Sequence, residues 1–317
     1  MSESPAAIAP APDGVSFVVP VYNKAAWLPR VLRQIEAQHG DFAREFIFVD
    51  DGSTDDSLAI LEATTAHWRN VTIRRQTNHG SAHATNQGIA LARLPYIKFV
   101  DADDLLADRA TETLLAALGG SDAVLAYGGV ERYDDETGID LQACRPGAAV
   151  HRIDAPLRPA LRNALFNPTQ FLVRTEVAQA VGGCDERIVH SQEYSLTLRL
   201  ARAGPFLRVD APVAFLPRDV PGRLGSHVGR QLQRVTRACA LFVADHPDLP
   251  WSVKQFACRR AAGRAWRYAR RHGDAGLDSP WFRAYLRSRL PMLSGHARFI
   301  DACASVFDAE AGQAVAG

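Results

Sequence analysis

The stretch IKFVDADDLLADR, residues 97–109, joins an apolar run to a cluster of acidic side chains. Residues 97–100 have the pattern of a buried strand, and Asp101, Asp103 and Asp104 follow at once. Three carboxylates this close repel one another unless a cation or solvent compensates them. Hard divalent ions take oxygen ligands, usually one or two carboxylates together with the phosphates of a substrate. The stretch therefore predicts a metal site at a strand end. The alternative is a solvated loop in which Asp104 caps the next helix.

Strands alternate with helices through the first two thirds of the chain. Short apolar runs at residues 15–20, 45–50 and 70–75 are each followed by a segment with helical spacing. Near-continuous apolar strands of this kind indicate an α/β domain with a mainly parallel sheet. Ligands of such sheets lie beyond the carboxyl ends of the strands. Asp50 and Asp51 also follow a strand, so we expect both acidic clusters at one edge of the sheet.

The pattern changes in the last third. We expect a strand and helix over residues 169–183, a helix over 191–204, and two short strands, FLRV and PVAFLP. Beyond residue 219 the strand signal stops, and three helical segments follow, at residues 227–246, 251–271 and 280–290. The sequence thus predicts a disordered tail over residues 1–14, an α/β domain over 15–219 and a helical region over 220–317.

Composition narrows the class of protein. A 47% hydrophobic and 22% charged content is typical of a soluble globular protein, and the net charge of +1 gives no field that would recruit nucleic acid. Five scattered cysteines without a CxxC pair favour a reducing compartment. No apolar stretch approaches the ~18–20 residues of a membrane span, and residues 1–14 do not resemble a secretory signal. We therefore expect a cytoplasmic protein.

Residues 251–271 depart from this even charge, with seven Lys or Arg and no Asp or Glu. On a helix, one stripe holds four of them: Arg260, Arg264, Arg267 and Arg271. The stripe is either the solvated basic face of a packed helix, which we favour, or a peripheral contact with the anionic inner face of a membrane.

Several other motifs have two interpretations each. Tyr22 either stacks on a nucleobase or packs beside a turn, and alone it favours packing. Ser53 or Thr54 can cap the next helix. His79 and His83 have the i, i+4 spacing of zinc ligands, but no third ligand accompanies them, so we interpret them as structural.

Glu193 lies near the start of an amphipathic helix. It either interacts favourably with the helix dipole or faces the ligand as a catalytic base. Spacing alone does not choose between the two.

Taken in order, five segments resemble the family 2 glycosyltransferases, which have the nucleotide-sugar-binding GT-A fold. They are VSFVVPVYNKAAWLPRVLRQI, EFIFVDDGSTDDS, NHGSAHATNQGIALARLPYIKFVDADD, FLVRTEVAQAVGGCDE and SQEYSLTLRLARAG. The resemblance covers about residues 15–216. It implies a Rossmann-like, mainly parallel mixed sheet flanked by helices, with a helical C-terminal extension.

The resemblance also implies roles for individual residues. The pocket for a uracil-type base would be lined by Pro20, Tyr22 and Asp51. The ribose and a Mn²⁺ or Mg²⁺ ion would be bound by Asp101 and Asp103, with Asp104 sharing the metal. Glu193 stands where the family usually has the aspartate that deprotonates the acceptor hydroxyl. The acceptor side would be lined by Asp185 and Glu186.

Besides Glu193, the chain departs from the family pattern at Thr85. Thr85 precedes Asn86, where the family usually has arginine. A phosphate contact is therefore missing, or it is supplied by Arg93, Lys98 or the loop near Arg218.

The implied function is transfer of a sugar from a nucleotide-diphosphate donor, of the UDP type, to an acceptor hydroxyl. The family usually inverts the anomeric centre, and we expect metal dependence and a place in cell-surface polysaccharide or glycoconjugate synthesis. Carbohydrate, lipid-linked and protein acceptors all stay open, as do the donor sugar, linkage and oligomeric state. A non-catalytic module that binds sugars or partners is one alternative. A receiver-like phosphoacceptor is a weaker one, because receivers place their acidic pair after the first strand.

Overall fold

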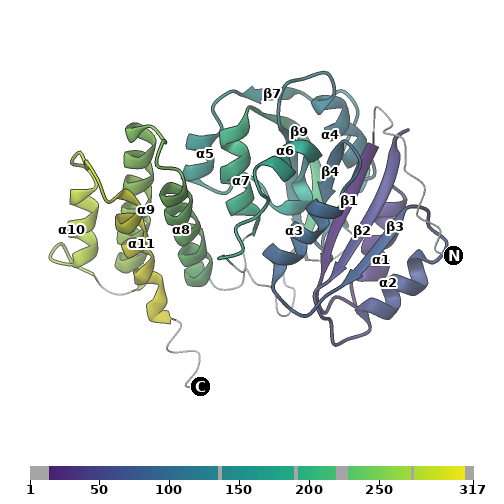
Figure 1. Cartoon of the computed structure of the whole chain (residues 1–317), viewed down its shortest axis with the longest axis horizontal. Coiled ribbons are helices and arrows are strands. Elements are labelled where there is room, and N and C mark those ends of the chain that lie inside the picture. Colours follow the sequence, from purple (N-terminus) through teal and green to yellow (C-terminus); the bar gives the residue numbers. More distant parts are fainter. Residues whose placement is uncertain (1–13, 135–137, 189–191, 219–227, 273–274, 311–317) are drawn as a thin grey trace.

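A computed structural model describes residues 14–134, 138–188, 192–218, 228–272 and 275–310 (Figure 1). Residues 1–13 of the predicted tail and the predicted boundary at residues 219 and 220 lie outside these ranges.

A single mixed sheet forms the centre of the N-terminal part of the molecule (Figure 1). Its strand order is β3-β2-β1-β4-β8-β6-β9-β5, and β7 also pairs with β9. The strands are β1 (Gly14–Val21), β2 (Ala43–Asp50), β3 (Val71–Arg75), β4 (Tyr96–Phe99), β5 (Leu105–Leu106), β6 (Leu125–Tyr133), β7 (Val150–Ile153), β8 (Phe171–Arg174) and β9 (Phe206–Pro217). The half formed by β3, β2, β1 and β4 is parallel, whereas β8 pairs antiparallel with both β4 and β6. The predicted fold class is confirmed.

Helices cover both faces of this sheet. They are α1 (Leu28–Glu36), α2 (Ser57–Thr65), α3 (Ser81–Leu91), α4 (Ala110–Leu118), α5 (Leu157–Arg162), α6 (Thr175–Ala180) and α7 (Gln192–Ala203). Successive residues of β1 face opposite sides, so Phe17 belongs to one buried cluster and Val18 to the other. The cluster with Phe17 includes Leu32 of α1 and Leu114 of α4, and the cluster with Val18 includes residues of α3 and α7.

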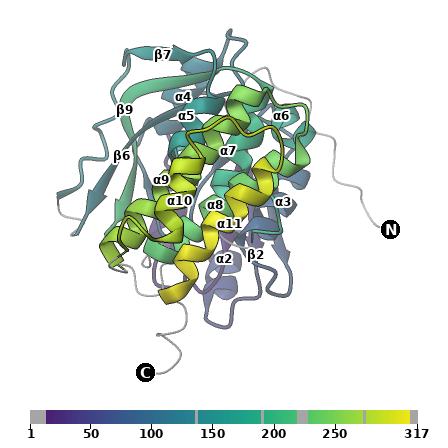
Figure 2. The same ribbon diagram turned by 90° about the vertical axis from the view of Figure 1, so that its left-hand side faces the viewer.

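The C-terminal part is helical, with α8 (Val228–Asp245), α9 (Trp251–His272), α10 (Pro280–Arg287) and α11 (His296–Ala304). Of these, α8 packs against α7 and α9 against α5, on the side away from β3, and α10 and α11 pack on them in turn (Figures 1 and 2). Phe242, Cys258 and Ile300 belong to the same buried cluster as Val18 of β1. The apolar core is therefore continuous from the sheet into this region. None of the helices in the described ranges combines the length and the apolarity needed to cross a bilayer.

Two local predictions are wrong, and some short elements were not predicted. The two short strands predicted around Pro212 are the single strand β9, whose pairing with β6 is irregular at that proline. The sheet tolerates the break because β6 carries Gly128 and Gly129 opposite it, where a side chain on Gly128 would meet Val213. Strand β7 and helices α5 and α11 were not predicted, because their segments are short or lack a strong period. Helix α2 begins at Ser57 rather than at Ser53 or Thr54.

Candidate active site

The loops that follow β1 and β2 hold each other at the carboxyl edge of the sheet. The backbone N–H groups of residues 23–25 donate, in order, to Ser53 Oγ at 3.0 Å, Ser57 Oγ at 2.8 Å and Asp55 Oδ2 at 3.0 Å. These oxygens thus satisfy the neighbouring loop, and neither Ser53 nor Thr54 caps α2. The predicted cap is wrong because a contact 30 residues away in the chain, from Asn23 to Ser53, takes precedence over the local one.

Asp51 is buried and holds a third loop at the same edge. Its Oδ1 accepts hydrogen bonds from Gln76 Nε2 and the His79 N–H, both at 2.8 Å, and its Oδ2 accepts from the Gly80 N–H at 2.8 Å. Gly52 follows with a φ of 76°, and a Cβ there would lie 2.9 Å from the backbone nitrogen of Asn78. The DDG turn therefore needs its glycine, and base recognition by Asp51 stays a prediction.

The side chain of Tyr22 lies just beyond the end of β1 and is 46% exposed. A packing tyrosine would bury its ring, so the structure does not favour the packing interpretation. The exposed ring is available to a planar ligand at the sheet edge.

The end of β4 is organised by Thr169, which the sequence did not single out. Its buried Oγ1 accepts the Asp101 N–H at 3.0 Å and donates to Asp104 Oδ2 at 2.8 Å. Its carbonyl accepts from Lys98 Nζ, which is fully buried. Burial lowers the pKa of Lys98 to about 7, against the opposing effect of Asp104 and Asp101. Asp104 is completely buried here and caps no helix, so it fits a loop-holding role better than that of a metal ligand.

We expect Thr169→Val to lower the free energy of unfolding by about 1–3 kcal/mol, because the isosteric valine leaves the buried Asp104 carboxylate and the Asp101 N–H without this partner. Thr169→Ser keeps the oxygen and is the matched control. Urea unfolding of the three proteins measures the difference. Equal stability of the valine and serine variants would contradict the role given to Thr169 Oγ1.

Asp101 and Asp103 fit a divalent cation. Asp101 is partly exposed, and Asp103 Oδ2 already accepts a hydrogen bond from the Lys24 ammonium at 2.7 Å. Lys24 follows β1 and Asp103 follows β4, so this ion pair bridges the two strand ends. Among the described residues, no group of three His, Cys, Asp or Glu is placed to hold a metal alone. The remaining ligands would therefore come from substrate phosphates and water, as is usual for Mg²⁺.

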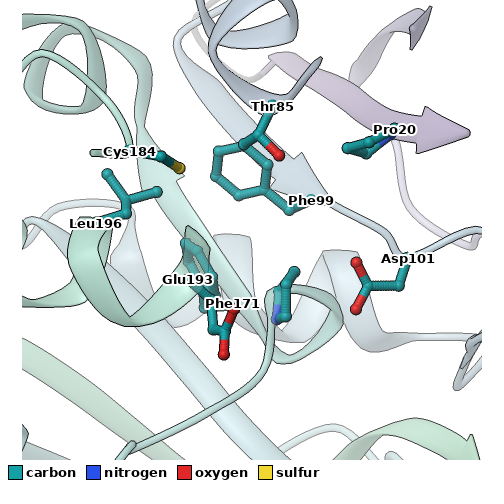
Figure 3. A pocket seen from close by; sticks show the side chains of 9 residues that line it. Pro20, Thr85, Phe99, Asp101, Phe171, Cys184, Glu193 and Leu196 are labelled. Atoms are coloured by element: carbon teal, nitrogen blue, oxygen red, sulfur yellow. The ribbon is translucent and has the colours of Figure 1, made fainter. Parts of the chain in front are cut away.

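Glu193, in the first turn of α7, lines a small pocket together with residues of these strand ends (Figure 3). The pocket is lined by Pro20, Thr85, Phe99, Asp101, Pro168, Phe171, Cys184, Glu193 and Leu196. Burial raises the pKa of Glu193 from 4.5 to about 7. Unlike Asp103, Glu193 has no ion pair with a lysine or arginine of the described ranges. A carboxylate in these surroundings is suited to accept a proton near neutral pH.

The two predicted acceptor-side residues are held by neighbouring elements. Glu186 Oε1 accepts a hydrogen bond from Asn86 Nδ2 at 2.7 Å. Arg187 donates to both oxygens of Asp185, at 2.8 and 2.7 Å, and also pairs with Asp245 of α8. Burial alone would raise the pKa of Asp185, but the Arg187 hydrogen bonds outweigh it and the pKa is lowered. Both residues therefore fix the loop before α7, and their contact with an acceptor stays a prediction.

The predicted substitutes for the missing phosphate-binding arginine are engaged elsewhere. Arg93 Nε lies 2.7 Å from Glu45 Oε1, at the amino end of β2, and Arg218 Nε lies 3.3 Å from Asp134 Oδ2. The Lys98 ammonium binds backbone carbonyls in the core. In this conformation Arg93 is paired with Glu45, and the buried Lys98 ammonium is held by backbone carbonyls, so the structure does not favour a phosphate contact by either.

His79 and His83 lie with ring centroids 4.8 Å apart. Each ring bonds to a polar neighbour, His79 to Thr77 and His83 to Gln76. This agrees with their interpretation as structural.

Solved structures with a similar fold bind nucleotide-sugars. The Staphylococcus aureus protein TarS, residues 1–349, in complex with UDP-GlcNAc superimposes with a TM-score of 0.66 at 18% identity, covering 95% of this chain and 92% of that one. The mannosyltransferase PcManGT of Pyrobaculum calidifontis, in complex with GDP-Man and Mn²⁺, gives a TM-score of 0.52 at 18% identity, covering 98% and 90%. At such identities the likeness shows the GT-A-like fold alone.

Sequence relatives are glycosyltransferases, and the matches span less than half of their length. Glycosyltransferase GlyG of Streptococcus pneumoniae is 37% identical over 125 residues, which are 39% of this chain and 41% of GlyG. The O-antigen biosynthesis protein RfbC of Myxococcus xanthus is 31% identical over 194 residues, 60% of this chain and 14% of RfbC. The profile of Glycosyl transferase family 2 matches residues 16–182, more than half of the chain. The chain therefore belongs to the family 2 glycosyltransferases, a class of glycosyl-transferring enzymes.

Proposed function

We propose that this protein transfers a sugar from a UDP-type nucleotide-sugar to an acceptor hydroxyl, with inversion at the anomeric carbon. The observation that carries the proposal is the pocket lined by Pro20 near the end of β1, Asp101 after β4 and Glu193 of α7. A nucleotide at the strand ends and a base on α7 would then face each other across the bond that breaks.

The donor would lie along the carboxyl edge of β1, β2 and β4. The exposed Tyr22 ring stacks on the base, and Asp51 and Pro20 line the base pocket. Asp101 contacts the ribose and, with Asp103, holds a Mn²⁺ or Mg²⁺ ion. When bound, such an ion neutralises the charge that develops on the departing diphosphate. Lys24, which already pairs with Asp103, adds a second positive charge at the same place.

Glu193 then acts on the acceptor. Its carboxylate takes the proton from the acceptor hydroxyl as the oxygen attacks the anomeric carbon. The bond from that carbon to the diphosphate oxygen breaks on the opposite face, and its electron pair leaves with the diphosphate. One displacement of this kind inverts the anomeric centre.

Two comparisons support the choice of donor and pathway. The TarS structure contains UDP-GlcNAc, and RfbC is named for O-antigen biosynthesis. We infer a uridine donor and a role in cell-surface polysaccharide or glycoconjugate synthesis. The domain division at about residue 219 belongs to the same proposal, with the α/β part carrying the site. The weaker phosphoacceptor alternative loses its basis, since the chain belongs to a glycosyltransferase family.

The test is a panel of UDP-, GDP- and dTDP-sugars, each incubated with the protein and Mn²⁺ and assayed for released nucleoside diphosphate. We expect at least one UDP-sugar to be hydrolysed or transferred. The Glu193→Gln variant, which keeps the donor site, serves as the background control. Donor binding without turnover by any sugar would instead favour the non-catalytic module.

Tyr22→Ala should lose about 1–3 kcal/mol of UDP binding, because the stacking contact with the base is removed. Tyr22→Phe keeps the ring and should bind like the wild type. Calorimetric titration with UDP measures both variants. An unchanged dissociation constant for a folded alanine variant would remove Tyr22 from the base pocket.

A further inference from the structure

Large apolar side chains are exposed at the far end of the C-terminal helices, where α10 lies at the end of the molecule away from β3 (Figure 1). Leu286 is 50% exposed, Leu290 65% and Leu293 92%, and Trp251 at the start of α9 is 46% exposed. No residue of α10 is buried. We refer to these four side chains and the segment 280–298 as the α10 surface. Large exposed apolar side chains are candidates for contact with another surface.

Side chains of α9 hold the loop that carries Leu290 and Leu293. Gln255 of α9 is buried, and its Nε2 donates to the carbonyls of Ser288 at 2.8 Å and Leu290 at 2.9 Å. Its Oε1 accepts the Met292 N–H at 3.0 Å, and the Trp251 indole donates to the Met292 carbonyl at 2.7 Å. The exposure of Leu290 and Leu293 is therefore built into the fold, since four hydrogen bonds define the loop.

The charge of the α10 surface has one sign. Between residues 279 and 300 the sequence has no Asp or Glu, and four exposed arginines lie there: Arg283, Arg287, Arg289 and Arg298. Within the described ranges none of the four pairs with an acidic side chain. Two of them make cation–π contacts instead. The guanidinium carbon of Arg287 lies 6.0 Å from the ring centroid of Phe299, and that of Arg289 lies 4.7 Å from the ring centroid of Tyr285. In the part of the chain that the structure describes, no ion pair therefore neutralises these four arginines.

The basic stripe predicted on α9 is a weaker candidate for binding another surface. Arg260 donates to the Arg162 carbonyl at 2.6 Å, and Arg264 lies 3.4 Å from Thr236 of α8. Both are half-buried against neighbouring helices, so the predicted stripe is not one exposed face. It also lacks the exposed leucines that lie around α10.

We propose that the α10 surface binds an anionic lipid membrane. Leu286, Leu290 and Leu293 enter the boundary between headgroups and acyl chains, Trp251 lies at the headgroup level, and the arginines contact lipid phosphates. An element with apolar side chains beside unpaired basic ones matches an anionic bilayer surface in both respects. A protein partner would have to supply several carboxylates to pair with the same four arginines, whereas an anionic bilayer offers phosphates over its whole surface. The inference is independent of sugar transfer, because vesicle binding needs no donor.

Co-sedimentation of the full chain with vesicles tests this. We expect binding to phosphatidylcholine vesicles that contain phosphatidylglycerol, weaker binding at high salt, and none to phosphatidylcholine alone. The double variant Arg283→Gln/Arg287→Gln should bind about 25-fold more weakly, at about fivefold for each arginine near an anionic surface. Leu290→Ser/Leu293→Ser should lose about tenfold or more. Val150→Ser, at an exposed valine of β7, is the matched control and should bind like the wild type.

Thermal melting and sedimentation velocity of each variant separate the outcomes. Loss of vesicle binding by both double variants, with an unchanged melting temperature and unchanged oligomeric state, supports the proposal. Equal binding to neutral and anionic vesicles, or binding that survives both double variants, overturns it. A wild type that self-associates and a Leu290→Ser/Leu293→Ser variant that does not would also overturn it, since a second copy would then cover these leucines.

Discussion

Glu193→Gln should lower turnover with the true donor and acceptor by about 10²–10⁴-fold, the usual contribution of a general base. Donor affinity should stay the same, because Glu193 lies on α7 and the nucleotide site is formed by the strand ends. The amide is nearly isosteric with the carboxylate but does not take up the acceptor proton. Steady-state kinetics with separate donor and acceptor titrations measure the two effects.

Two further proteins control this experiment. Glu176→Gln changes an exposed first-turn glutamate of α6 and should leave turnover unchanged. Glu193→Asp restores the residue that the family usually has and should keep much of the activity. Turnover of Glu193→Gln close to that of the wild type would remove Glu193 from the mechanism. Asp185 would be a poor alternative general base, since both oxygens of its carboxylate already accept hydrogen bonds from Arg187.

The raised pKa of Glu193 gives the same assignment a pH signature. The base must be ionised, so kcat/KM of the wild type should rise as the pH passes through about 7. Stability should move in the opposite direction. Between pH 4.5 and about 7 the folded protein retains this proton, whereas the unfolded chain releases it. The free energy of unfolding therefore falls as the pH rises through that interval. Glu193→Gln should lose both dependences.

Asp103→Asn should lower kcat/KM by about 10³-fold, which corresponds to about 4 kcal/mol of transition-state stabilisation. The change removes one charge from the cation site at the end of β4 and leaves Lys24 without its carboxylate partner. Donor hydrolysis at a series of Mn²⁺ concentrations is the measurement, and we expect a weaker apparent metal affinity. Asp108→Asn, four residues beyond the acidic cluster, is the matched control and should behave like the wild type. Wild-type kinetics in Asp103→Asn would exclude it as a metal ligand.

The parts of this protein that sequence predicted are those encoded locally. Apolar runs such as residues 45–50 predicted their strands, and the order of the acidic turns predicted a common edge, because parallel strands end on the same side. Pro20, Asp101 and Glu193, to which the family resemblance gives roles, line one pocket.

The parts that sequence did not predict depend on distant contacts. Thr169 holds Asp101 from 68 residues away, and nothing in its local pattern separates it from any other buried threonine. The pairing of Lys24 with Asp103 joins residues 79 apart. The predicted start of helix α2 is too early. Ser53 and Asp55 have side chains suited to a helix cap, but they accept hydrogen bonds from the loop after β1 instead. Local propensity is overridden wherever tertiary structure offers the same groups a better partner.

Calorimetric titration of the wild-type protein with UDP, in Mn²⁺ and again in EDTA, tests most directly whether the carboxyl edge of β1 and β4 binds a nucleoside diphosphate. The account predicts saturable binding in Mn²⁺ and a large loss of affinity in EDTA, because Asp101 and Asp103 then face the diphosphate without an intervening cation. Equal affinity with and without the metal, or no binding of UDP at all, would contradict it.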